Sequence, residues 1–320
     1  MQFHVASQQP VALDGLASML DAVEARMFAA ISANPPNVLK KTGGASDAAA
    51  YHLRAGGQRV RAKIALQAAL AVGLRAADAI TIAATVELLH NASLVHDDIH
   101  DRDEVRRGQQ AVWLRFGVNT AICTGDLLLS AAYATLCKIE GPLVSPALSR
   151  MIPLMHERTA MAIDGQCADL VASTQTLDND ATGITQYEQI AAAKSGALLS
   201  LPIELVLLAS SHQEYLPEAW RAARAFAMGY QIVDDLHDAQ SDGSSDTRQG
   251  VYNIISVLKG MGTEDESVEK AKRLGLEKID LAIVLAKRLP YNTGEQLAQY
   301  AYQLRSVLVQ KKIEVMTGGH

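Results

Sequence analysis

The chain of 320 residues is 49% hydrophobic and 20% charged, and it carries a net charge of −6 at pH 7. This is the composition of an ordinary globular protein, and its acidic balance argues against a dedicated nucleic-acid-binding protein, because those are usually basic. Residues 1–10 contain no basic stretch followed by an apolar one, and no apolar run suggests a transmembrane helix. We therefore expect a cytoplasmic protein without a signal peptide or a transmembrane segment.

Apolar residues recur at helical spacing along most of the chain. Near its start, Leu16, Leu20, Val23 and Met27 have this spacing and predict a first helix. Residues 79–96 are rich in Ala, Leu and Val, which predicts a central buried helix. No long alternation of Val, Ile and Thr indicates a sheet. We expect one all-α domain over residues 1–320, with breaks at the Pro-, Gly-, Asn- or Asp-containing segments 34–37, 141–142, 242–245 and 290–294.

Two acidic clusters share one pattern. Residues 97–101 read Asp-Asp-Ile-His-Asp, and residues 234–238 read Asp-Asp-Leu-His-Asp. On a helix, the first and last aspartates of each cluster lie on one side, because they are four residues apart. A single cluster of this kind is more often solvated surface, but both clusters follow apolar stretches, which indicates the mouth of a buried region. Facing one another across a cavity, they could hold a diphosphate through Mg²⁺, which prefers oxygen ligands.

Zinc is a poor fit to the same clusters. Histidines lie nearby, but no cysteine accompanies them and the carboxylates outnumber them. The three cysteines, Cys123, Cys137 and Cys167, lack the spacing of a metal site, and we expect them to be reduced residues of the core.

Basic and glycine-containing segments accompany the acidic clusters in a fixed order. They are Gly-Gly-Gln-Arg at 56–59, Arg-Arg-Gly at 106–108, Lys-Ser-Gly at 194–196 and Gly-Tyr-Gln at 229–231. With these motifs, residues 56–255 resemble the trans-isoprenyl diphosphate synthases, also called polyprenyl synthetases. The resemblance implies an all-α, isoprenoid synthase-type helical bundle around a central cavity, in a homodimer. It further implies a magnesium-dependent prenyltransferase, with three Mg²⁺ ions, whose partners are an allylic diphosphate and isopentenyl diphosphate.

The resemblance assigns roles to individual residues. The implied metal ligands are Asp97, Asp98, Asp101, Asp234, Asp235 and Asp238. The allylic diphosphate would be bound by Arg106, Lys194, Ser195 and Gln231. Isopentenyl diphosphate would be bound by Gln58, Arg59, His90 and Arg107. Gln166 and Asp169 match a supporting polar pair below the metals.

The implied chemistry is ionisation of the allylic diphosphate followed by attack of the isopentenyl double bond. Metal ions and basic side chains would stabilise the charge that develops on the departing diphosphate. Product length would depend on the depth of the cavity below the first acidic cluster. Ala92 and Ser93, one turn before Asp97, are small, which favours products of twenty carbons or more.

Three departures from the family pattern leave alternatives open. Gln58 and Val251 stand where the family has lysines, the segment 239–251 is short and lacks a further lysine, and residues 252–255 read Tyr-Asn-Ile-Ile in place of Thr-Leu-Pro. Each lost charge-assisted phosphate bond could cost about 1.5–3 kcal/mol. One alternative is therefore an enzyme of the same fold with altered chemistry, acting as an allylic diphosphate cyclase or lyase or using another acceptor. After the synthase and this variant enzyme, a third possibility is a regulatory subunit of a heteromeric synthase, although the retained acidic and basic residues argue against it.

Overall fold

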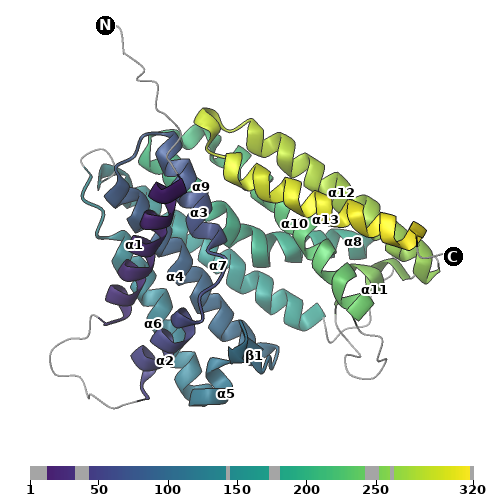
Figure 1. Ribbon diagram of the computed structural model, residues 1–320, viewed down its shortest axis with the longest axis horizontal. Helices are drawn as coiled ribbons and strands as arrows, with labels where there is room; N and C mark the ends of the chain where they lie inside the picture. Colours follow the sequence, from purple (N-terminus) through teal and green to yellow (C-terminus); the bar gives the residue numbers. More distant parts are fainter. Residues whose placement is uncertain are drawn as a thin grey trace, which may run out of the picture. The chain divides into compact units, whose positions relative to one another are not determined.

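A computed structural model describes residues 13–32, 43–141, 145–172, 181–241, 252–259 and 263–317 of the chain (Figure 1). The described residues are helical almost throughout, so the all-α prediction is confirmed. Within them, strand structure is limited to a short antiparallel pair, β1 (Val105–Arg106) and β2 (Gln109–Gln110). The chain divides into two compact units, residues 1–66 with 76–138 and residues 67–75 with 139–320. The assignment of residues 1–320 to a single domain stays a prediction.

The first unit is built around one long helix, α4 (Ala76–His100), which α1 and α6 contact along its length (Figure 1). Its core residues include Ile82, Leu88 and Val95, so the predicted central buried helix is confirmed. The first predicted helix is α1, in which Val23 and Met27 are buried. The helices of this unit are α1 (Leu13–Ser32), α2 (Ala45–Arg54), α3 (Val60–Ala71, whose last turn belongs to the second unit), α4, α5 (Val112–Phe116) and α6 (Val118–Leu136).

The second unit has a fully buried helix, α9 (Ala197–Ala209), and a long helix, α10 (Leu216–Ser241), that packs on α9 and α12. Helices α12 and α13 lie side by side in Figure 1 and contact one another. Its other helices are α7 (Leu148–Ala172), α8 (Ala181–Ala191), the π-helix η2 (Ala192–Gly196), α11 (Ile254–Lys259), α12 (Glu264–Lys287) and α13 (Glu295–Thr317). Short 3₁₀ turns cover Ser145–Ala147 (η1), Gln213–Tyr215 (η3) and Pro290–Asn292 (η4).

The predicted break at residues 290–294 is confirmed and has a clear physical basis. Helix α12 ends at Lys287, and Tyr291 and Asn292 adopt left-handed backbone angles before α13 begins. A side chain at Gly294 would place its Cβ 2.2 Å from the carbonyl oxygen of Ala286, so only glycine permits this close turn. Gly141 lies outside any helix, whereas Pro142 and the predicted breaks at 34–37 and 242–245 lie outside the described residues.

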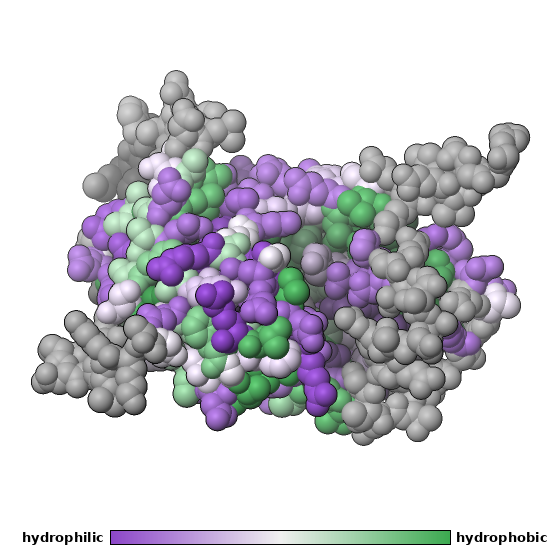
Figure 2. Space-filling view, turned by 60° about the horizontal axis from the view of Figure 1, so that its bottom comes forward, coloured by the Kyte–Doolittle hydropathy of each residue, from purple (hydrophilic) through white to green (hydrophobic). Residues whose placement is uncertain are grey.

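Two expectations about surface and core need correction. No stretch of transmembrane length was expected, but Gly183–Ala209 is long and apolar enough to cross a membrane. Its most apolar part is 83% buried inside the protein, as is usual for a core helix. On the face drawn in Figure 2, hydrophobic residues form small patches scattered among hydrophilic ones. The three cysteines are exposed, not buried in the core. Their spacing reports no orientation: α6 and α7 turn Cys123 and Cys167 to solvent, and Cys137 lies in the turn that follows α6.

Candidate functional site

The first acidic cluster lies at the carboxyl end of α4, where the helix leaves the core. Asp97 is half-buried and Asp101 is exposed, whereas Asp98 has no exposed surface. Arg106 donates from Nε to Asp98 Oδ1 over 2.7 Å and forms a second close contact with the same oxygen. Burial raises the pKa of the Asp98 carboxyl, and the Arg106 guanidinium opposes that rise. Asp98 therefore faces inward and holds Arg106, while Asp97 and Asp101 lie toward solvent.

Arg106 and Arg107 belong to the β1–β2 hairpin. Arg107 and Gly108 form its turn with φ angles of 53° and 77°, and positive φ at both central residues is typical of a type I′ turn, which suits a tight hairpin. The turn sends the two arginines to different partners. Arg106 also contacts Asp103 at 3.1 Å, whereas Arg107 contacts the connection between α2 and α3.

The Arg107 guanidinium fits against the glycine pair at residues 56–57. It donates to the carbonyl oxygen of Gly56 and, over 3.2 Å, to Asn91 Oδ1. A Cβ on Gly57 would lie 2.8 Å from the Arg107 guanidinium carbon. Burial, and then the charge of Arg59, lower the pKa of Arg107. The Gly-Gly pair thus accepts a hydrogen bond from Arg107 and leaves the space that its guanidinium occupies.

Two histidines complete a basic cluster with these arginines. His52 bonds through Nε2 to Asn91 Oδ1 over 3.1 Å, and burial together with Arg107 lowers its pKa to about 3. The pKa of His90 is lowered well below its ordinary value, first by burial and then by Arg61 and Arg107. Both imidazoles are neutral at physiological pH. Four positive guanidinium groups and two neutral histidines therefore gather in this unit, a composition suited to binding a phosphate group.

Arg59 and Arg61 differ from what the sequence indicated. Arg59 is buried, with a left-handed φ of 52°, and its guanidinium bonds to Glu24 at 2.9 Å and approaches Glu87 at 3.8 Å. Gln58 beside it is exposed. Arg61, which sequence reasoning missed, is half-buried and lies close enough to His90 to lower its pKa. The sequence signal that could have identified Arg61 is its position in the first turn of α3, whereas Arg59 comes just before the helix. Side chains at these two kinds of position point in different directions.

In the second unit, Lys194 lies in the π-helix η2 and donates from Nζ to Asp169 Oδ2 of α7 over 2.6 Å. Helix α7 approaches this segment closely because it carries glycine at 165, where a Cβ would lie 2.4 Å from the Lys194 backbone nitrogen. Gln166 is buried beside this contact, and neither atom of its amide group has a hydrogen-bond partner among the described residues. Ser195 is half-buried in the same π-helix. Single turns of π-helix are frequent at functional sites.

The second acidic cluster lies in the last turns of α10 and repeats the arrangement of the first. Asp234 and Asp238 are exposed, whereas Asp235 is 8% exposed. Asp235 accepts hydrogen bonds from Tyr187 Oη at 2.7 Å, from the backbone nitrogen of Ile254 at 2.8 Å and from Gln231 Nε2 at 3.0 Å. The pKa of Asp234 is raised, first because surrounding protein displaces water and then because Asp238 is negatively charged. In both clusters, the second aspartate faces inward.

The oxygen-rich donors fit a hard divalent cation. Among the described residues, no group of three or more His, Cys, Asp or Glu side chains is close enough to hold a metal without other ligands. Mg²⁺ usually takes one or two carboxylates and completes its shell with water and phosphate, so a carboxylate pair in each cluster suits it. The negative charge of Asp238 disfavours ionisation of Asp234, and a bound cation would relieve this repulsion.

Ala92 and Ser93 occupy the expected turn of α4. Ala92 is buried, and Ser93 donates from Oγ to the carbonyl oxygen of His90 over 2.9 Å. Leu88, one turn earlier, is fully buried.

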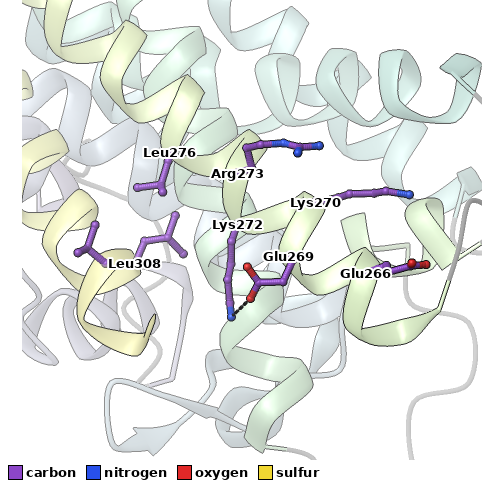
Figure 3. Close-up of a pocket in the computed structure, with 8 residues that line it drawn as sticks. Glu266, Glu269, Lys270, Lys272, Arg273, Leu276 and Leu308 are labelled. Carbon is purple, nitrogen blue, oxygen red and sulfur yellow. Dashed lines mark hydrogen bonds and ion pairs between the residues drawn. The ribbon is translucent and has the colours of Figure 1, made fainter. Parts of the chain in front are cut away.

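A separate pocket of about 540 Å³ lies on α12 and α13 (Figure 3). Lys272 and Glu269, three residues apart on α12, pair at its edge at 2.8 Å, and Leu276 and Leu308 are apolar lining residues. It contains none of the candidate site residues.

Comparison with known proteins identifies relatives of this arrangement. Residues 44–255 match the model of the polyprenyl synthetase family. The chain is 30% identical over 246 residues to a geranylgeranyl pyrophosphate synthase of Geoglobus acetivorans, covering 71% of this chain and 75% of that relative. It is 32% identical over 248 residues to the chloroplastic geranylgeranyl pyrophosphate synthase 11 of Arabidopsis thaliana, covering 73% and 68%.

Solved structures agree with the sequence comparison. The geranylgeranyl pyrophosphate synthetase structure from Geoglobus acetivorans matches with a TM-score of 0.74 and 25% identity, covering 90% of this chain and 98% of that one. A decaprenyl diphosphate synthase from Rhodobacter capsulatus matches with a TM-score of 0.74 at 20% identity, covering 92% and 98%, which supports the fold alone.

Proposed function

This chain belongs to the polyprenyl synthetase family, and we propose that it condenses an allylic diphosphate with isopentenyl diphosphate to give a longer trans-prenyl diphosphate. The observation that carries the proposal is the ion pair between Asp98 and Arg106. It joins the acidic cluster to the basic cluster within one unit, so that metal-binding and phosphate-binding groups adjoin. Such an arrangement suits a substrate whose reactive part is a diphosphate.

Arg106 and Lys194 bind the allylic diphosphate and take up the negative charge that develops as its carbon–oxygen bond breaks. Asp98 and Asp103 orient the Arg106 guanidinium, and Asp169 orients the Lys194 ammonium. Preorganised cations of this kind lower the barrier to ionisation, because they need no rearrangement as charge develops. In the second unit, Ser195, which follows Lys194 in the chain, and Gln231 of α10 add polar groups.

Arg107 and Arg61 bind isopentenyl diphosphate through their positive charges. His90, whose pKa both arginines lower, adds a neutral ring, and the exposed Gln58 adds an amide group. His90 is neutral and its Nδ1 is buried without a hydrogen-bond partner in the described part of the chain, so it is placed to bond a ligand. The Arg59 guanidinium pairs with Glu24 and approaches Glu87, so within this proposal Arg107 and Arg61 are the main anchors, and a direct role for Arg59 stays a prediction. The double bond of isopentenyl diphosphate then forms the new carbon–carbon bond, and its proton passes to the departing diphosphate.

Asp97 and Asp101 in the first unit, and Asp234 and Asp238 in the second, would hold Mg²⁺, and the family resemblance implies three ions in all. When bound, Mg²⁺ supplies positive charge that neutralises the diphosphate leaving group. Asp235 positions its neighbours, because both of its oxygens accept hydrogen bonds from protein groups, and Asp98 holds Arg106 through Oδ1, while its Oδ2 is buried without a hydrogen-bond partner among the described residues. Direct metal ligation by Asp98 and Asp235 stays a prediction. Gln166 and Asp169 remain the supporting polar pair.

The product has twenty carbons or more. Ala92 and Ser93 are small and leave room in the turn below Asp97. Two relatives, of whose lengths the match covers 75% and 68%, are named geranylgeranyl pyrophosphate synthases. The chain acts as a homodimer in the cytoplasm. Val118 and Ile122, four residues apart on α6, are exposed apolar side chains, as is Leu114 on α5, and they support self-association.

A second candidate function is altered chemistry on an allylic diphosphate alone. The exposed neutral Gln58 favours it, because a lysine there would add a cation for isopentenyl diphosphate. Val251 lies outside the described residues. The third candidate, a regulatory subunit, gains no support from the oriented Arg106 and Lys194.

Product analysis separates these candidates. Purified protein is incubated with Mg²⁺ and geranyl, farnesyl or geranylgeranyl diphosphate, with and without isopentenyl diphosphate. Longer diphosphates formed only with isopentenyl diphosphate support the synthase. Hydrocarbon or alcohol formed without it supports altered chemistry, and turnover that requires a second chain supports the subunit.

A further inference from the structure

The Asp235 carboxylate connects three segments of the second unit. Gln231 lies one turn earlier on α10, Tyr187 lies on α8, and Ile254 begins α11. Both Asp235 oxygens accept hydrogen bonds in a buried environment. Hydrogen bonds to a charged acceptor are roughly twice as strong as neutral ones, so these contacts fix the helix more firmly than ordinary side-chain contacts would.

Tyr187 is the one side chain from another helix that meets this carboxylate in the described residues. Its ring is 3% exposed and lies 5.9 Å from the Tyr252 ring, centroid to centroid. Its hydroxyl donates a hydrogen bond to Asp235 Oδ2 over 2.7 Å.

The position of Asp235 in α10 gives this contact its consequence. Helix α10 ends at Ser241, and helix ends fray unless other groups hold them. Asp234 and Asp238 lie in the same last turns and are exposed. Because Asp235 is turned inward and held, its neighbours at 234 and 238 are held in one outward direction.

We propose that Tyr187 is a positioning residue for the second acidic cluster. Acting through Asp235, it fixes the last turns of α10 and the start of α11, so that Asp234 and Asp238 present one fixed arrangement to a divalent cation and its diphosphate. This inference rests on the proposed function for the identity of that ligand. The Tyr187–Asp235–Ile254 contact itself does not depend on it.

The test compares Tyr187→Phe with a matched control, Tyr252→Phe. The first variant removes the hydroxyl bonded to Asp235 and keeps the ring. The control removes a neighbouring tyrosine hydroxyl that bonds to the Gly183 carbonyl at 3.3 Å and does not touch Asp235. For both variants we measure the Mg²⁺ dependence, the KM for each substrate, the thermal midpoint and amide exchange at Ile254.

For Tyr187→Phe we expect the Mg²⁺ concentration at half-maximal rate and the KM for the allylic diphosphate to rise about tenfold, the loss of one charged hydrogen bond. The KM for isopentenyl diphosphate stays unchanged, and the Ile254 amide exchanges faster. Tyr252→Phe keeps the wild-type Mg²⁺ dependence. Wild-type constants and exchange in Tyr187→Phe, or a fall in thermal midpoint alone, would overturn the proposal.

Two further measurements keep the test decisive. If Tyr187→Phe does not fold, Asp235→Asn replaces it, because it keeps the side-chain shape and one acceptor oxygen. Asp235→Asn must raise the KM for the allylic diphosphate and leave the KM for isopentenyl diphosphate unchanged. Equal changes in both KM values would overturn the proposal. Failure of the proposed function appears separately, as wild-type protein that makes no longer diphosphate. In that case, slower or unchanged Ile254 exchange in Tyr187→Phe still refutes the positioning role.

Discussion

The Arg107 guanidinium donates a hydrogen bond to the backbone carbonyl of Gly56, and a Cβ on the adjacent Gly57 would lie 2.8 Å from the guanidinium carbon. The Gly-Gly-Gln-Arg segment at 56–59 and the Arg-Arg-Gly segment at 106–108 are far apart in the sequence but are in direct contact in the structure. The glycines leave space for an arginine that the sequence alone assigns to isopentenyl diphosphate.

Gly57→Ala should displace Arg107. Besides the clash, Gly57 has a φ of 134°, which is costly for any residue with a side chain. We expect the KM for isopentenyl diphosphate to rise about tenfold or more, because an arginine–phosphate contact is weakened, with little change in the KM for the allylic substrate. The control is Gly73→Ala, at a φ of 73° with nothing within 4 Å, which should lower stability without altering either KM. Equal kinetic effects of both variants would contradict this account.

Gly165→Ala should push α7 away from the π-helix. The new Cβ would meet the Lys194 backbone nitrogen at 2.4 Å, and backbone moves less readily than a flexible side chain. We expect a loss of about 1–3 kcal/mol in the free energy of unfolding, together with a large fall in kcat as Lys194 shifts. Urea unfolding and steady-state kinetics measure both. Gly196→Ala, whose nearest contact would be 3.4 Å, should be mild, and a wild-type kcat in Gly165→Ala would count against the role of Lys194.

Arg158 and Glu204 form a buried ion pair in the second unit. Arg158 donates to both Glu204 oxygens at 2.8 and 2.7 Å, and Ser200 donates to Glu204 at 2.8 Å. Glu204→Gln leaves the buried Arg158 charge without its buried counter-charge, and we expect the free energy of unfolding to fall by about 3–5 kcal/mol. Glu157→Gln removes the other, exposed partner of Arg158 and should cost less than about 1 kcal/mol. Denaturant titration of the two variants tests the difference, which an equal loss would refute.

The buried histidines should make the protein less stable in mild acid. The pKa of His52 is lowered from an ordinary 6.5 to about 3, so the unfolded chain takes up a proton that the folded state refuses. This contribution to stability is complete above pH 6.5 and is lost as the pH falls from 6.5 toward 3. Between pH 7 and 5.5 we expect a loss of about 1 kcal/mol from His52, with His90 acting in the same direction. His52→Gln, which keeps a donor for Asn91, should reduce the acid sensitivity by that amount, and an unchanged pH dependence would exclude His52 as a cause.

Ala92→Phe tests the proposal on product length. A phenyl ring in the turn below Asp97 would fill the space that a growing chain needs, so products should become shorter. Chromatography of the dephosphorylated products measures this, and Leu88→Ala provides the opposite change. Unaltered length in Ala92→Phe would mean that the limit of the cavity lies elsewhere.

Much of the fold could be predicted because helical spacing reports burial directly. The apolar run at 79–96 became the buried α4, and the turn residues at 290–294 became the turn before α13. Spacing also indicated that Asp97 and Asp101 lie on one side of a helix, and Asp101, which directly follows α4, donates its backbone N–H to the Asp97 carbonyl at 2.8 Å. Tertiary contacts decided what spacing does not record, namely that Asp98 and Asp235 face inward and accept from Arg106 and Tyr187.

The remaining surprises have the same origin. Arg59 precedes α3 with a left-handed backbone and is drawn into the core by Glu24 and Glu87, which leaves Arg61 nearer His90. The close approach of the π-helix at Lys194 to α7 depends on the missing side chain of Gly165, on a different helix. No local pattern reports such contacts.

The ratio of pyrophosphate released to isopentenyl units incorporated is the most direct test of the central claim, that this chain couples allylic ionisation to condensation. Labelled isopentenyl diphosphate and an unlabelled allylic diphosphate are supplied with Mg²⁺ to purified protein, and both products are counted. We predict one pyrophosphate for each unit incorporated, with both lost in Asp97→Asn and in Asp234→Asn. Pyrophosphate released from the allylic substrate without incorporation of label would contradict the claim.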